Sequence, residues 1–151
     1  MTDTPVAGQR TPDPFELDRF VAAQDAGASY ASAVQELRAG YKSSHWMWFV
    51  FPQVAGLGRS AMAQRYAISG RAEAAAYLAH PVLGPRLRDC AAILIDLLGR
   101  NAVQILGGID AQKLQSCMTL FHLVAPDETL FSEVLERYYA GELDQATLRL
   151  L

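Results

Sequence analysis

The sequence predicts a mainly α-helical fold: a compact single-domain bundle of about six to eight helices, with at most a minor strand element. Apolar residues recur at three- and four-residue spacing along most of the chain, which is the period of a helix face. Hydrophobic residues make up 51% of the 151 residues, enough for one core of ordinary domain size. Residues 1–12 are polar and rich in Pro, Gly and Thr, so we expect a flexible tail there and one domain over 13–151.

The first helix is expected to begin at a capping sequence. Asp13 would cap it, Pro14 suits its first position, and Glu16 would complete a capping box. Gly27 is the expected end of this helix, and a second helix is expected over 29–40, with a glycine as its terminator.

Further helices are expected wherever apolar residues keep helical spacing. The stretch 85–98 has a core face that includes Leu98, and Ile93 and Ile95 extend its apolar surface nearly all round. Because a helix that is apolar on most sides is buried on most sides, we expect this one to be central. The others are placed over 59–67, 73–79, 110–124 and 126–141, with a last turn or two capped by Asp144.

The segment 42–52 is unusual because it holds both tryptophans of the chain among other large apolar side chains. As a strand it would be apolar on both faces and would need burial on both sides. As a helix it would be capped by Ser44 and ended by Pro52. We favour a short helix, because the surrounding sequence is helical. The rings predict either an aromatic core, the interpretation we favour, or a pocket wall where indole and imidazole groups find polar partners.

Gly56, Gly58 and Ala61 match the G-x-G-x-x-A form of the dinucleotide-binding motif. That motif needs a strand before it and a parallel sheet beneath it, and neither is indicated here. We therefore interpret the segment as a turn at a helix start. Its backbone N–H groups, together with Arg59, are candidates for holding one phosphate or carboxylate.

Lys113 lies in the middle of the apolar arc of the helix predicted over 110–124. The polar side chains of that helix, Ser116 and Thr119 among them, are expected on the opposite face. A buried ammonium is costly unless it is paired. Lys113 therefore either extends past the helix end or pairs with Asp110, which we favour, or it points into an apolar pocket where it binds an anion.

Charge and cysteine content exclude several classes of protein. Thirteen Lys and Arg against sixteen Asp and Glu give a net charge of −3 without a basic cluster, so no nucleic-acid partner is expected. No apolar run reaches the ~20 residues of a membrane span, and residues 1–11 lack the apolar stretch of a secretory signal, so we expect a cytoplasmic protein with no membrane partner. Cys90 and Cys117 lack the paired spacing of a zinc site, so we expect two buried thiols, no metal and no cofactor.

Four runs of residues are distinctive together. They are Asp13-Pro14-Phe15, Lys42-x-Ser44-His45-Trp46-Met47-Trp48-Phe49, Gly56-Leu57-Gly58-x-Ser60 and Asp110-x-x-Lys113-Leu114-x-Ser116. In these runs the chain resembles the uncharacterised bacterial family known as domain of unknown function 1810, and the resemblance covers nearly all of residues 13–151. It implies a compact helical domain and supplies no function. A fainter similarity, in size and helical organisation only, is to N-glycosidases that act on ADP-ribose linkages.

These observations predict a small-molecule-binding domain whose ligand is a nucleotide or another anionic compound, with hydrolase or N-glycosidase-like activity left open. An aromatic wall can stack a ring while lysines hold an anionic group. The alternative is a non-catalytic interaction or oligomerisation module that uses the 46–51 face, and homo-oligomer formation is left open. We expect Lys113 and His45 to line one pocket with Trp46. The candidate ligand-binding residues are Lys42, Ser44, His45, Trp46, Trp48, Gly58, Arg59, Ser60, Asp110, Lys113 and Ser116.

Overall fold

The computed structural model describes residues 12–151, so the tail expected over 1–12 lies outside the described residues apart from Pro12. The helices are α1 (Asp18–Asp25), α2 (Ser29–Ala39), α3 (Met47–Val50), α4 (Ala61–Arg65), α5 (Arg71–Ala79), α6 (Leu83–Asp96), α7 (Ala102–Leu106), α8 (Gly108–Val124), α9 (Thr129–Tyr139) and α10 (Gln145–Leu150). A 3-10 turn, Ala26–Ala28, joins α1 to α2. Within the described residues the strand-like pairing is one isolated bridge between Val54 and Ile68. The mainly helical fold class is therefore confirmed.

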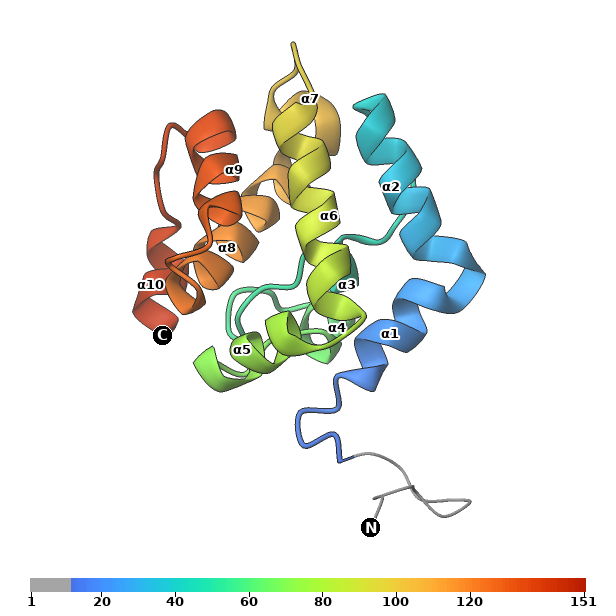
Figure 1. The fold of residues 1–151 in the computed structure, drawn as a ribbon, viewed down its shortest axis with the longest axis vertical. Coiled ribbons are helices and arrows are strands. Elements are labelled where there is room, and N and C mark those ends of the chain that lie inside the picture. Colours follow the sequence, from blue (N-terminus) through green and yellow to red (C-terminus); the bar gives the residue numbers. More distant parts are fainter. Residues whose placement is uncertain (1–11) are drawn as a thin grey trace.

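The helices form one bundle in which α8 has neighbours on most of its sides. It packs against α5, α7, α9 and α10, while α6 packs against α2, α5 and α9. In Figure 1, α6 stands upright between α2 and α9, α5 crosses near its lower end, and α10 lies beside α8. The expectation that the 85–98 helix is buried nearly all round is wrong. Ile93 and Ile95 are only half-buried, and Leu98, just beyond the helix end, is 77% exposed.

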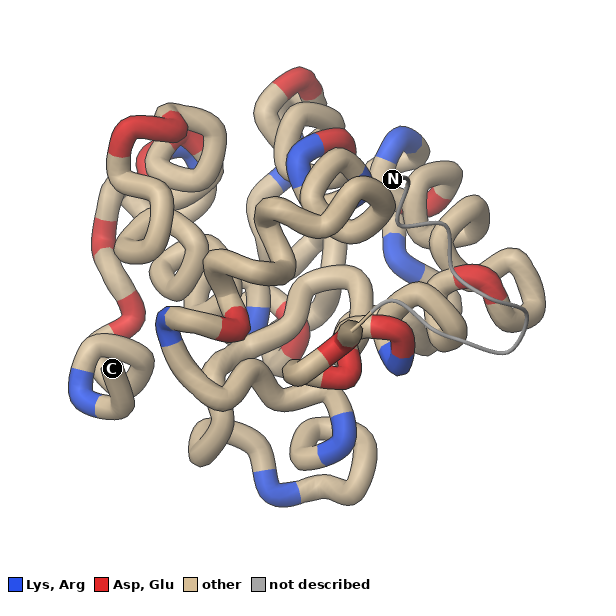
Figure 2. Tube along the Cα trace, turned by 60° about the horizontal axis from the view of Figure 1, so that its bottom comes forward, with Lys and Arg blue, Asp and Glu red and all other residues tan. Residues whose placement is uncertain are grey.

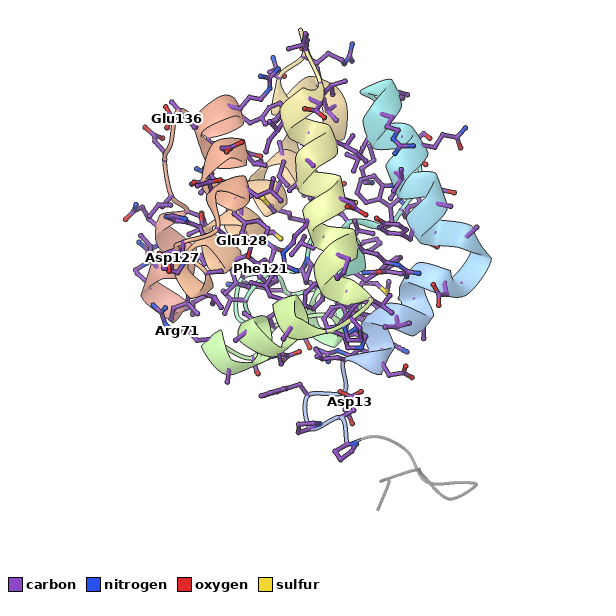
Figure 3. The ribbon with its side chains drawn as sticks, in the orientation of Figure 1. Asp13, Arg71, Phe121, Asp127, Glu128 and Glu136 are labelled. Carbon is purple, nitrogen blue, oxygen red and sulfur yellow. The ribbon has the colours of Figure 1, made fainter. Side chains whose placement is uncertain are left out.

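A chain of aromatic rings fills the core. The ring of Phe20 lies 5.1 Å from that of Tyr77, which lies 5.4 Å from Phe121, and Phe121 lies 5.9 Å from Phe131. Phe121 belongs to α8 and appears inside the bundle in Figure 3. These contacts join α1, α5, α8 and α9, so apolar burial holds together helices that are distant in sequence.

The start of α1 differs from the expected capping box. Asp13 does act as a cap, because its carboxylate accepts the backbone N–H groups of Leu17, at 2.7 Å, and Asp18, at 2.9 Å. Figure 3 labels Asp13 in the segment that leads into α1. Glu16, however, has a φ of 54° and is exposed, so it does not close a box, and the helix begins only at Asp18. An extra turn over 13–16 separates the cap from the helix.

The segment 42–52 contains the short helix that was favoured, α3. Ser44 does not cap it as expected: Trp46 occupies the N-cap position without a side-chain bond. The rings of Trp46, Phe49 and Phe51 are buried within the chain, whereas Trp48 is half-buried. Most of the segment therefore belongs to the core, as favoured, and the ring of Trp48 is partly exposed at the surface.

Helix α8 is more enclosed than its sequence indicates. Ser116 and Thr119 were expected on a solvent face, but both are buried. The placement is possible because both hydroxyls are hydrogen-bonded: Thr119 donates to the backbone carbonyl four residues earlier, and Ser116 donates to the carboxylate of Asp144. Hydrogen-bonded hydroxyls can face a neighbouring helix, so polarity alone does not mark the outer face.

The distribution of charged residues and the burial of the two cysteines follow the sequence analysis. Figure 2 shows Lys and Arg interspersed with Asp and Glu, with no extended stretch of either sign in that view. Cys90 and Cys117 are both buried and free, and burial raises the pKa of the Cys90 thiol to about 12. Among the described helices none is long and apolar enough to span a membrane.

Candidate functional site

Two adjoining cavities share the loop residues Gln53 and Gly58 in their walls. The first, which we call the neutral cavity, has a volume of about 160 Å³ and no charged residue in its wall. The second, the charged groove, has a volume of about 280 Å³ and lies between the loop, the start of α8 and the start of α10. The neutral cavity is lined by Trp48, Gln53, Val54, Ala55, Gly56, Gly58, Ala63, Gln64, Tyr66 and Ala67. The charged groove is lined by Gln53, Leu57, Gly58, Ile109, Gln112, Lys113, Ser116, Asp144 and Ala146.

Backbone contacts fix the loop that the two cavities share. The Gln53 carbonyl accepts the Ile68 N–H at 2.8 Å, and the Ala55 N–H donates to the Ile68 carbonyl at 2.7 Å. At Gly58, an added Cβ would lie 2.4 Å from the Cβ of Ala63, so only glycine allows this close approach to α4. Ser60 caps α4 by accepting the Ala63 N–H at 3.1 Å. The interpretation of the G-x-G-x-x-A match as a turn at a helix start is therefore confirmed.

Lys113 projects from the second turn of α8 into the charged groove. Its side chain is only 22% exposed, and its Nζ lies 3.7 Å from Asp110 Oδ1 and 5.2 Å from the centre of the Trp48 ring. At 3.7 Å the contact is an ion pair without a hydrogen bond, since N–H···O bonds span about 2.7–3.2 Å. Within residues 12–151 the Lys113 ammonium donates no hydrogen bond at all.

Lys42 is the stronger partner of Asp110. Its Nζ lies 3.0 Å from Asp110 Oδ2 and also donates to the Ser44 carbonyl at 2.6 Å. Its side chain is 9% exposed, and its backbone N–H donates to the Ile105 carbonyl. Lys42 and Asp110 therefore neutralise each other, and Lys113 keeps an ammonium that is only loosely compensated. The expected pairing of Lys113 with Asp110 is present, but in this weak form.

Glu36 on α2 organises the loop that carries Lys42. Its carboxylate accepts hydrogen bonds from the backbone N–H groups of Ser43 and Ser44, from the Ser44 hydroxyl and from the Trp46 indole. Burial alone would raise the pKa of Glu36, but these donors outweigh it and lower the pKa from 4.5 to about 2. Ser44 and Trp46 thus direct their polar groups to Glu36 and not to the groove.

Asp144 brings a carboxylate to the groove at the start of α10. Its Oδ2 accepts hydrogen bonds from the Ser116 hydroxyl at 2.9 Å, from the Thr147 N–H at 3.1 Å and from the Thr147 hydroxyl. Its other oxygen, Oδ1, accepts no hydrogen bond from residues 12–151. Because Ser116 is one turn beyond Lys113 on the same helix face, the Asp144 carboxylate and the lysine line the same groove.

Four of the eleven candidate residues from the sequence line the two cavities, and two more adjoin them. Gly58, Lys113 and Ser116 line the charged groove, Gly58 and Trp48 line the neutral cavity, and Lys42 and Asp110 adjoin them through the contacts described above. Three candidates are exposed and line neither cavity: His45, Arg59 and Ser60.

Sequence reasoning missed the four residues that bring amide and carboxylate side chains to the cavities. Gln53 and Gln64 are uncharged loop and helix residues without a distinctive pattern, and Gln112 looks like an ordinary surface residue. Asp144 looks like a helix cap, which it also is. Its place in the groove wall depends on its hydrogen bond with the unexpectedly buried Ser116. Sequence patterns do not show this contact, because the two residues are 28 positions apart.

The site offers one ammonium, one carboxylate and amide groups around an aromatic wall. Such a set can bind and orient a small polar molecule. Among the described residues no group of three His, Cys, Asp or Glu side chains is arranged to hold a metal ion.

Comparisons with known proteins agree with the fold. The profile of the family described as "Protein of unknown function (DUF1810)" matches residues 14–151. The crystal structure of the conserved hypothetical protein Rv1873 from Mycobacterium tuberculosis is 50% identical to this chain, with a TM-score of 0.89. The match covers 92% of this chain and 98% of that one. No curated protein matches the chain.

Proposed function

We propose that this chain, which belongs to the DUF1810 family, binds a small molecule through an anionic group in the charged groove, with the Lys113 ammonium as the principal contact of that group. The family description carries no activity, so the proposal comes from the groove itself.

One observation carries the proposal: Lys113 is mostly buried, yet its ammonium donates no hydrogen bond among the described residues. An ammonium that has lost part of its access to water without full compensation is unfavourable. Asp110 does not supply that compensation, because Lys42 holds it at the shorter distance of 3.0 Å. An anion in the groove would give Lys113 the charge-assisted hydrogen bonds that it lacks.

The groove has the position and lining that a binding site needs. It adjoins the neutral cavity through Gln53 and Gly58, and Trp48 in the neutral cavity contacts Lys113. The volumes of the two cavities, about 160 and 280 Å³, are each below the roughly 300–1,000 Å³ typical of ligand sites, which favours a compact ligand. Hydrolase or N-glycosidase-like activity on such a ligand stays a prediction.

The alternative function, an interaction module that uses the 46–51 face, has no such support. Most side chains of that face are covered by the chain's own helices. A surface that is already covered offers no apolar patch to a partner.

A thermal-shift experiment tests the proposal with three probes of different anionic character: 3-phenylpropanoate, inorganic phosphate and AMP. We expect at least one of them to raise the Tm of the unmodified protein, by roughly 3 °C at ten times its Kd. Lys113→Met should abolish this rise, because methionine keeps the apolar stem and removes the charge.

Arg59→Met is the matched control, because Arg59 is an exposed cation next to the same loop but outside the groove wall. It should leave the rise in Tm unchanged. The proposal is wrong if none of the three probes raises Tm, or if the rise survives in Lys113→Met.

A further inference from the structure

The charged groove pairs its cation with an anion. Lys113 and Asp144 line the same groove, and Ser116 joins them, since it lies one turn from Lys113 and donates to Asp144 at 2.9 Å. The two charged side chains do not form an ion pair with each other: no ion pair with an N···O distance of 4.0 Å or less joins them among the described residues. Space therefore remains between an ammonium and a carboxylate that face one groove.

Both charges have unused capacity for hydrogen bonds. The Lys113 ammonium donates none within residues 12–151, and Asp144 receives all its donors on Oδ2. A carboxylate oxygen without a donor accepts one from an ammonium or hydroxyl group of a ligand. The site thus has one place for a negative group and one for a positive group.

The net charge of the region argues against a multiply charged anion. Lys42 and Asp110 neutralise each other, and Lys113 and Asp144 sum to zero. A phosphate with about two negative charges would gain one ammonium and would meet the Asp144 carboxylate as well as Asp110. A ligand with one charge of each sign satisfies the two groove residues together.

The neutral cavity accounts for the rest of such a ligand. Its wall combines the rings of Trp48 and Tyr66 with small apolar side chains and the amides of Gln53 and Gln64. No charged residue contributes to it, so it suits an uncharged, compact and partly apolar group.

We infer that the ligand is a small zwitterion of the α-amino-acid class, with its carboxylate on Lys113, its ammonium on Asp144 and its uncharged side chain in the neutral cavity. This inference rests on the proposed function, since it assumes that Lys113 binds the anionic group.

Isothermal titration calorimetry with three matched probes tests it. L-phenylalanine carries both charged groups, 3-phenylpropanoate lacks the ammonium, and 2-phenylethylamine lacks the carboxylate. We expect L-phenylalanine to bind at least ten-fold more tightly than either analogue. Asp144→Asn should reduce the preference for L-phenylalanine over 3-phenylpropanoate to less than three-fold, and asparagine keeps the helix cap.

Asp127→Asn is the matched control, because Asp127 is an exposed carboxylate just before α9 and lines neither cavity (Figure 3). It should leave the ten-fold preference intact. The comparison of the three probes on the unmodified protein needs no variant, so the test holds even if Asp144→Asn fails to fold.

The inference and the proposed function fail in different ways. If 3-phenylpropanoate binds as tightly as L-phenylalanine, or if Asp144→Asn leaves the preference unchanged, the zwitterion inference is wrong while the anion site stands. If L-phenylalanine does not bind, the zwitterion inference is also wrong. If no anionic probe, including inorganic phosphate and AMP, shows binding that depends on Lys113, the proposed function fails as well.

Discussion

Two polar clusters lie close together in this fold, and they differ in how completely they are paired. In the first, Glu36 accepts four hydrogen bonds from the loop over 43–46. In the second, the charged groove, Lys113 donates no hydrogen bond among the described residues, although only 22% of its side chain is exposed. Asp110 lies between the clusters and pairs closely with Lys42 and loosely with Lys113.

The difference separates a structural polar cluster from a candidate site. A buried polar group whose partners are all within the chain stabilises the fold and has nothing left for a ligand. A charged group that folding leaves incompletely paired has binding capacity to spare. Substitutions in the first cluster should therefore affect stability, and those in the second should affect binding.

The largest effect is expected from Glu36→Gln. Glutamine removes the negative charge and turns an amide N–H₂ toward groups that are themselves donors. Hydrogen bonds to a charged group contribute about 1.5–3 kcal/mol each, and several are disturbed here, so we expect a loss of about 3 kcal/mol in the free energy of unfolding. Urea unfolding measures it. Glu133→Gln, at an exposed position on α9, should change stability by less than about 0.5 kcal/mol. A similar small change at Glu36 would mean that its hydrogen bonds do not hold the loop.

Acid should remove the same contribution without any substitution. Because the folded-state pKa of Glu36 is lowered from 4.5 to about 2, its contribution is complete above about pH 4.5 and is lost as the pH falls toward 2. The free energy of unfolding, measured from pH 6 to pH 2, should therefore fall more steeply for the unmodified protein than for Glu36→Gln. Parallel curves would show that Glu36 does not titrate in this window.

The next largest effect is expected from Lys42→Met. The change leaves the Ser44 carbonyl without its ammonium donor and leaves Asp110 with only the looser contact to Lys113. Removing one partner of a buried pair costs about 3–5 kcal/mol, but Asp110 is partly exposed and Lys113 can move toward it, so we expect a loss of about 2 kcal/mol. Chemical unfolding of this variant gives the value directly. No loss would show that the contacts of Lys42 with Ser44 and Asp110 do not stabilise the fold.

The end of α2 and the unusual position of Lys113 could be predicted from the sequence, because each depends on residues that are close together along the chain. Gly40 ends α2 as expected because it adopts a positive φ, whereas α1 already ends at Asp25 and Gly27 lies within the 3-10 turn that follows. Lys113 stands out because it interrupts an apolar arc, and the lysine does lie mostly buried. Asn101 and Gln104 form the capping box of α7, a signal that was present in the sequence although no helix was predicted there.

The rest depends on contacts between distant segments. The four donors of Glu36 come from seven to ten residues further on, beyond the end of its helix, so helical periodicity carries no sign of them. Ser116 and Thr119 look like surface residues until α10 and the loop before it cover them, because Asp144 then contacts both. The expected pocket of Lys113, His45 and Trp46 is not formed as predicted, since Trp46 bonds to Glu36 and His45 is exposed.

A smaller effect is expected at the loop between the two cavities. Gly58→Ala would place a Cβ 2.4 Å from that of Ala63, so the loop or α4 must shift. Overpacking of this kind costs typically 1–3 kcal/mol, and we expect about 1 kcal/mol because the loop lies at the surface. Gly108→Ala, at the first position of α8, is the control, since nothing lies within 4 Å of an added Cβ there. Equal unfolding free energies for the two variants would show that Gly58 is not tightly packed.

The smallest effect on stability is expected from Lys113→Met, and it tests the central claim most directly. The claim is that folding pairs Lys42 and leaves Lys113 free for a ligand. Urea unfolding of Lys113→Met, without ligand and beside Lys42→Met, should give a free energy within about 0.5 kcal/mol of the unmodified protein, or above it, because a loosely paired buried charge is replaced by an apolar side chain of similar length. A loss as large as that of Lys42→Met would contradict the account, since Lys113 would then belong to the structural cluster.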